Sequence, residues 1–99
     1  MAPEPRMPNR LGTEGKKLWT GIVGEFDLFH EPHKLRILFD ACKLADQVKK
    51  LDDAAIKAPL TVKGSMGQEV INPVISAAQS ARGLLAQLLG RLNFEAMDY

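Results

Sequence analysis

The chain has 99 residues, of which 45% are hydrophobic and 25% are charged, and thirteen basic against twelve acidic residues give it a formal net charge of +1. This length allows one domain with a small core, which association with further copies would help to stabilise. The near-neutral charge excludes a strongly basic nucleic-acid-binding protein, so any such binding has to come from local charge or from several copies acting together.

The cysteine content and the hydropathy exclude two further classes of protein. Cys42 is the single cysteine, which rules out a disulfide framework and a cysteine-based metal cluster. No apolar run approaches the roughly 18 residues that indicate a membrane span, and the N-terminus lacks the apolar segment of a signal peptide. We therefore expect a soluble cytoplasmic protein without a membrane partner.

Residues 1–12 form the first segment, and they are rich in proline, with three prolines among the first eight positions. They show no hydrophobic periodicity, which predicts a disordered or extended arm. Arg6 and Arg10 make this arm mildly basic. Such an arm either contacts DNA phosphates or is simply solvated.

A first helix is predicted to begin with Thr13 as its N-cap and to end near Phe26. Trp19 lies on its apolar face and is expected in the core, because no other aromatic residue is interleaved with basic residues as in a base-stacking surface. The outer side carries Lys16 and Lys17. The whole apolar face consists of Leu18, Trp19, Ile22, Val23 and Phe26.

A linker over residues 27–31 leads into a second helix, which Pro32 opens. His30 and His33 lie three residues apart, a spacing that metal ligands can have. No third ligand is nearby and the proline interrupts the geometry. Capping or surface positions are the better interpretation of the two histidines.

The second helix is predicted over residues 32–57, about seven turns, with two apolar stripes. One stripe runs the full length, and the other covers only the first half on nearly the opposite side. The first half should therefore pack on two sides and the second half on one. Cys42 lies in the shorter stripe and is expected to be a small buried side chain rather than a nucleophile, because no base is placed beside it.

A row of basic residues at intervals of seven lies between these stripes, with a spacing of about 10.5 Å along the helix. It is formed by Arg36, Lys43, Lys50 and Lys57. Such a row suits a phosphate backbone. The alternative is an ordinary solvated face, because the i,i+4 ion pairs Asp46–Lys50 and Asp53–Lys57 would dilute its charge.

Residues 60–71 are predicted to form a β-hairpin with its turn at residues 64–67, after Pro59 ends the long helix. A two-stranded hairpin is marginally stable alone, so it should pack on the helix ends or join hairpins of other subunits. The turn sequence GSMG lacks the spacing of a phosphate-binding P-loop.

The last helix is predicted from the N-cap Asn72 and Pro73 to Leu92, packed antiparallel on the long helix through a leucine face. Its back carries an uncharged stripe of small or amide residues, which is either a weakly polar surface or a contact with a neighbouring subunit. A glycine inside a helix costs about 1 kcal/mol relative to alanine, which favours close packing there. The stripe consists of Ser76, Ser80, Gly83 and Gln87.

These elements predict a mainly α single domain over residues 13–93, with a flexible arm at residues 1–12 and a short acidic tail at residues 94–99. Four segments then occur in a fixed order: GKKLW in the first helix, ACKLAD in the long helix, VINPVI after the hairpin and ARGLLAQLLGRLNF at the end. In this order they are similar to the small subunit of tailed-phage terminases, over residues 12–94.

The resemblance implies a non-catalytic protein without cofactor, metal or small-molecule substrate. It would assemble as a homo-oligomeric ring in the bacterial host cytoplasm, bind double-stranded viral DNA, and deliver it to the terminase large subunit, which has the ATPase and nuclease. The residues expected to contact DNA are Arg6, Arg10, Lys16, Lys17, Arg36, Lys43 and Lys50. The stripe Ser76, Ser80, Gly83 and Gln87 would lie between subunits, together with the hairpin.

A second hypothesis is a small helical adaptor or DNA-binding transcription regulator with no role in packaging. It predicts a monomer or a dimer, and a regulator should also bind a defined sequence. An enzyme is a distant third hypothesis, because the sequence contains no acid–base pair, ligand cluster or phosphate loop.

Overall fold

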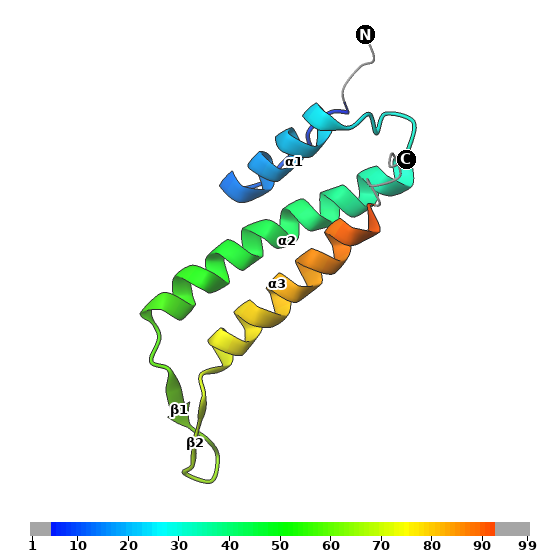
Figure 1. The fold of residues 1–99 in the computed structure, drawn as a ribbon. Helices are drawn as coiled ribbons and strands as arrows, with labels where there is room; N and C mark the ends of the chain where they lie inside the picture. Colours follow the sequence, from blue (N-terminus) through cyan, green and yellow to red (C-terminus); the bar gives the residue numbers. More distant parts are fainter. Residues whose placement is uncertain (1–4, 93–99) are drawn as a thin grey trace.

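The fold is mainly α, as predicted, and a computed structural model describes residues 5–92 (Figure 1). Two helices, α1 (Thr13–Glu25) and α2 (Pro32–Lys57), come first. A hairpin of β1 (Thr61–Lys63) and β2 (Glu69–Ile71) leads into α3 (Pro73–Arg91). The predicted tail at residues 94–99 and position 93, the last of the predicted domain, lie outside the described residues.

Helix α2 is the element against which both other helices pack. Figure 1 shows α1 beside only its first half, whereas α3 runs back along α2 from the hairpin in the antiparallel direction. The prediction that the first half of α2 packs on two sides is therefore confirmed. All the buried residues of α2 fall at or before position 48: Leu38, Ala41, Cys42, Ala45 and Val48.

The core joins the arm, all three helices and the linker between α1 and α2. Trp19 is 4% exposed and lies in this core, as predicted. Leu11 and Leu28 are also core residues, although both lie outside the helices where periodicity can reveal a buried face. Leu11 anchors the end of the arm, so residues 10–12 have a fixed path despite their proline-rich surroundings.

The start of α3 follows the prediction, whereas the start of α1 does not. The Asn72 side chain accepts a hydrogen bond from the backbone N–H of Val74 at 3.1 Å and donates one to the carbonyl oxygen of Pro59 at 3.0 Å. It therefore caps α3 and closes the base of the hairpin. Helix α1 has Gly12 as its N-cap, and a glycine has no side chain that can cap the helix. The predicted cap, Thr13, is the first helical residue instead.

The hairpin extends beyond the ends of α2 and α3 (Figure 1). Its strands pair in antiparallel register, with Thr61 opposite Ile71 and Lys63 opposite Glu69. Gly67 has a φ of 85°, which favours glycine in the turn. No residue between positions 49 and 77 is buried. The molecule thus has a packed end and a hairpin end without a core of its own.

Large apolar side chains are exposed at this hairpin end. Ile56 is 82% exposed and Met66 is 89% exposed. Leu60 and Ile71 are more than half exposed as well. Single exposed apolar residues are ordinary, whereas these four fall within one short stretch of the chain, residues 56–71.

Candidate nucleic-acid interface

The start of α1 is capped by a carboxylate from α2. Asp46 accepts a hydrogen bond from the backbone N–H of Gly12 at 2.7 Å through Oδ2, and one from the backbone N–H of Gly15 at 2.8 Å through Oδ1. The first N–H groups of a helix have no intrahelical partner and carry the positive end of its dipole. Asp46 therefore satisfies two donors and supplies the charge that this helix end favours.

Two glycines make this close approach possible. A Cβ atom at Gly15 would lie 2.7 Å from the backbone oxygen of Cys42 and 2.6 Å from Asp46 Oδ2. A Cβ atom at Gly12 would lie 2.8 Å from Asp46 Oδ1. The sequence segments GKKLW and ACKLAD thus meet at one crossing, where α1 rests almost backbone to backbone on α2.

Cys42 lies beneath this crossing and is fully buried, as predicted from its stripe. Burial raises the pKa of its thiol from 9.0 to about 12, and the nearby negative charge of Asp46 acts in the same direction. The thiol is therefore protonated at neutral pH, and the thiolate needed for nucleophilic chemistry does not form.

Two predicted ion pairs of α2 are wrong, and the difference changes the charge of its surface. Asp46 binds the start of α1 instead of Lys50. Asp53 pairs with Lys49, with Nζ and Oδ1 3.1 Å apart, instead of Lys57. Asp53 has a lysine four residues away on each side, and spacing alone does not choose between Lys49 and Lys57. The carboxylate of Asp46 faces α1 and is bound there. Lys50 consequently has no salt bridge with any described residue.

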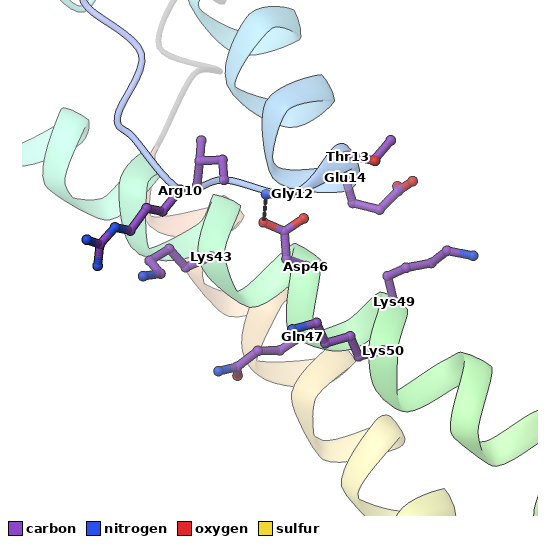
Figure 2. Close-up of a pocket in the computed structure, with 10 residues that line it drawn as sticks. Arg10, Gly12, Thr13, Glu14, Lys43, Asp46, Gln47, Lys49 and Lys50 are labelled. Atoms are coloured by element: carbon purple, nitrogen blue, oxygen red, sulfur yellow. Dashed lines mark hydrogen bonds between the residues drawn. The ribbon is translucent and has the colours of Figure 1, made fainter.

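Three of the predicted DNA-binding residues converge on one cleft of about 540 Å³ between the arm and α2. They are Arg10, Lys43 and Lys50, and Figure 2 shows Arg10 and Lys43 extending on the same side of the arm. None of the three forms a salt bridge within residues 5–92. The cleft is also lined by Lys49, which pairs with Asp53, and by two acids. Asp46 binds the backbone of α1 through both oxygens, and Glu14 pairs with Lys17. We name this place the arm cleft.

The basic row continues from the arm cleft toward the start of α2 through Phe39. The guanidinium of Arg36 lies 5.5 Å from the centre of this ring, and the ammonium of Lys43 lies 5.7 Å from it. Arg36 also pairs with Asp40 at 3.3 Å, which reduces its net charge toward a ligand. The row therefore persists in the structure, and Lys43, Lys50 and Lys57 form no salt bridge among the described residues.

The other predicted DNA contacts do not join the arm cleft. Lys17 pairs with Glu14 at 3.6 Å on the outer side of α1, and Lys16 is exposed there. Arg6 lines a separate hollow with its neighbours in the arm. These residues can add to the positive field, but the structure does not bring them to one place with the others.

The predicted intersubunit stripe lies on the surface of α3 in the single chain. Ser76, Ser80, Gly83 and Gln87 are all exposed. A Cβ atom at Gly83 would find no atom within 4 Å, so no contact within the chain requires glycine there. Leu84, next to the stripe, is 49% exposed. On the other side of α3, Arg82 forms an ion pair with Asp52 of α2.

The role of Asp46 was missed by reasoning from the sequence. One signal was present: Asp46 lies four residues after Cys42 and therefore on the same, buried side of α2. An acid on that side needs hydrogen-bond donors, and the start of a neighbouring helix supplies them. The exposed apolar residues of the hairpin end were also missed. The hairpin was expected to pack on the helix ends or to join hairpins of other subunits, and in the single chain its apolar side chains stay exposed.

Comparisons with protein-family models, with curated proteins and with solved structures found no significant match to this chain.

Within residues 5–92, no group of three or more His, Cys, Asp or Glu side chains is placed to hold a metal ion. His30 and His33 are both exposed, and the His30 ring meets Phe29 edge-on at 5.0 Å. No helix among the described residues is long and apolar enough to cross a membrane.

The close crossing of α1 over α2 predicts opposite changes in stability for two glycine-to-alanine substitutions in α1. Gly15→Ala should destabilise the fold by about 1–3 kcal/mol, because its Cβ collides with backbone that cannot move independently. Gly21→Ala, in the same helix, should stabilise it by up to about 1 kcal/mol, because its Cβ meets no atom within 4 Å. Urea unfolding followed by circular dichroism measures both changes. Equal effects at the two positions would contradict the close crossing.

Burial of Cys42 predicts a loss of stability in alkaline solution. Below pH 9 the thiol is protonated in both the folded and the unfolded chain, so its contribution is fully present. Between pH 9 and pH 12 the unfolded chain loses this proton and the folded chain keeps it. The free energy of unfolding should then fall by about 1.4 kcal/mol per pH unit more than in Cys42→Ala. If the free energy of unfolding falls equally with pH in the natural chain and in Cys42→Ala, the thiol is not buried.

Proposed function

We propose that this chain is the non-catalytic DNA-recognition subunit of a phage DNA-packaging terminase. It assembles as a homo-oligomeric ring, binds double-stranded viral DNA in the host cytoplasm, and delivers it to the large subunit that has the ATPase and nuclease. The observation that carries this proposal is the arm cleft. It is lined by three cations that form no salt bridge among the described residues, and its two acids are bound elsewhere, Asp46 to backbone N–H groups and Glu14 to Lys17.

The meeting of two sequence segments supports the resemblance on which this proposal also rests. GKKLW and ACKLAD are short and degenerate, and each by itself indicates little. In the fold, Gly15 of the first segment packs on Cys42 and Asp46 of the second. The two segments therefore share one place in the fold, the capped crossing of α1 over α2.

The hairpin end supports assembly. Residues 49–77 include no buried residue, yet they carry Ile56, Leu60, Met66 and Ile71 at the surface. Burying this apolar surface against further copies would contribute about 25 cal/mol for each Å² removed from water. The uncharged stripe on α3 begins next to the hairpin, so both surfaces can take part in one contact between neighbouring subunits.

Assembly would also compensate for the small number of cations in each subunit. Three phosphate contacts give weak binding, and their contribution falls with salt, with a slope of about −0.9 per contact in a plot of log affinity against log salt. A ring presents several arm clefts to one duplex, and the linked sites then bind far more tightly than one site alone.

Native mass measurement with and without duplex DNA tests assembly and binding together. We expect a species several times the 10.9 kDa mass of one chain, and binding to DNA that weakens with salt and differs little between sequences. A chain that stays monomeric at high micromolar concentration would contradict the proposal. A dimer that prefers one defined sequence would favour a transcription regulator instead.

The stripe on α3 gives a separate test of the subunit interface. Gly83→Arg places a long charged side chain in the stripe and should dissociate the assembly while leaving the helix content unchanged. Gly21→Arg is the matched control, because Gly21 lies on α1 and, like Gly83, has open space around its Cβ position. Sedimentation analysis of both variants measures the effect. A Gly83→Arg protein that assembles like the control would exclude this face as an interface.

A further inference from the structure

The arm cleft depends on how the arm is held, and two successive residues hold it. Leu11 is 5% exposed and sits in the core. The backbone N–H of Gly12 donates to Asp46 at 2.7 Å. Arg10 directly precedes them and has a φ of 69°, in the left-handed region that residues other than glycine seldom adopt. The position of Arg10 therefore follows from contacts made by the next two residues.

We propose that Asp46, an acidic residue, is a positioning residue for DNA, because it holds Arg10 beside Lys43 and Lys50 so that the three bind one stretch of phosphate backbone. This inference rests on the proposed function, and it adds which residue positions the DNA-binding side chains. Figure 2 shows Asp46 between the arm and α2, with Arg10 and Lys43 together on one side of it.

Simple electrostatics predicts the opposite effect for Asp46. A carboxylate near a phosphate repels it, so its removal should strengthen DNA binding. In this fold the Asp46 oxygens face the start of α1, whose N–H groups and positive dipole end offset much of that charge. Its removal frees the arm, so Arg10 is no longer held in the cleft. Its phosphate contact is then lost, because one exposed contact does not repay the entropy of ordering the arm.

A pair of variants with the same change in charge separates these two effects. Asp46→Asn and Asp53→Asn each remove one negative charge from the same helix. Asp53 touches Lys49 and has no hydrogen bond to the arm among the described residues. An asparagine at position 46 has one acceptor oxygen in place of two, so it cannot bind both Gly12 and Gly15 as the carboxylate does.

The experiment measures the affinity of the full chain for a duplex DNA of fixed sequence over a series of salt concentrations. We expect Asp53→Asn to bind as tightly as the natural chain or more tightly. Asp46→Asn should bind several-fold more weakly. Its salt slope should be smaller by about 0.9 for each bound subunit, which corresponds to one lost phosphate contact. A residue that only stabilises the fold would not reduce the slope in this way.

Arg10→Ala tests whether Asp46 acts through Arg10. If it does, the double variant Asp46→Asn/Arg10→Ala should bind like Arg10→Ala alone, because the positioned side chain is already missing. Gly12→Ala offers a variant without a charge change, since its Cβ would lie 2.8 Å from Asp46 Oδ1 and displace the cap. It should weaken binding as Asp46→Asn does, and it keeps the test open if the latter fails to fold by circular dichroism.

Two results would overturn the inference and leave the proposed function standing. One is that Asp46→Asn strengthens binding as Asp53→Asn does, and the other is that the effects of Asp46→Asn and Arg10→Ala simply add. A natural chain that binds no duplex DNA even at low salt would overturn both the inference and the proposed function.

Discussion

The carboxylate of Asp46 binds two backbone N–H groups at the start of α1, and most of the packed end of the molecule is arranged around this contact. It brings α1 close enough to α2 that glycine is needed at positions 12 and 15. The close crossing buries Cys42 and suits a small side chain there. It also fixes the end of the arm. Leu11 is then buried in the core, and Arg10 lines the arm cleft together with residues of α2.

The same contact changes the charge of the surface around it. An acid that sequence spacing assigns to Lys50 is instead bound to the start of α1. Lys50 and Lys43 line the arm cleft with Arg10, without a salt bridge among the described residues. A chain with a net charge of +1 thereby presents, in one cleft, three cations that form no salt bridge among the described residues. Net charge is a property of composition, whereas a binding site depends on where the opposite charges are held.

The two halves of α2 differ in what they pack against. The first half of this helix carries the core and the arm cleft, and the second half leads to a hairpin end in which no residue from 49 to 77 is buried. Contacts within one chain stabilise the first part. The second part offers apolar side chains and an uncharged helix face, which are the surfaces that further copies can cover. Under the proposed function, the cleft contacts DNA and the hairpin end assembles the ring.

Local patterns in the sequence determined the helices, the hairpin, the Asn72 cap and the burial of Trp19 and Cys42, because periodicity, proline and cap residues act over a few neighbouring positions. Tertiary structure alone decided the partner of Asp46, the burial of Leu11 and the convergence of Arg10 with two lysines of α2. These contacts join residues more than thirty positions apart, and the start of α1 had no local side chain to cap it. A cap from a distant helix has no fixed spacing in the sequence. The position of Asp46 four residues after Cys42 indicates only the side of α2 on which it lies, and the partner follows from the fold.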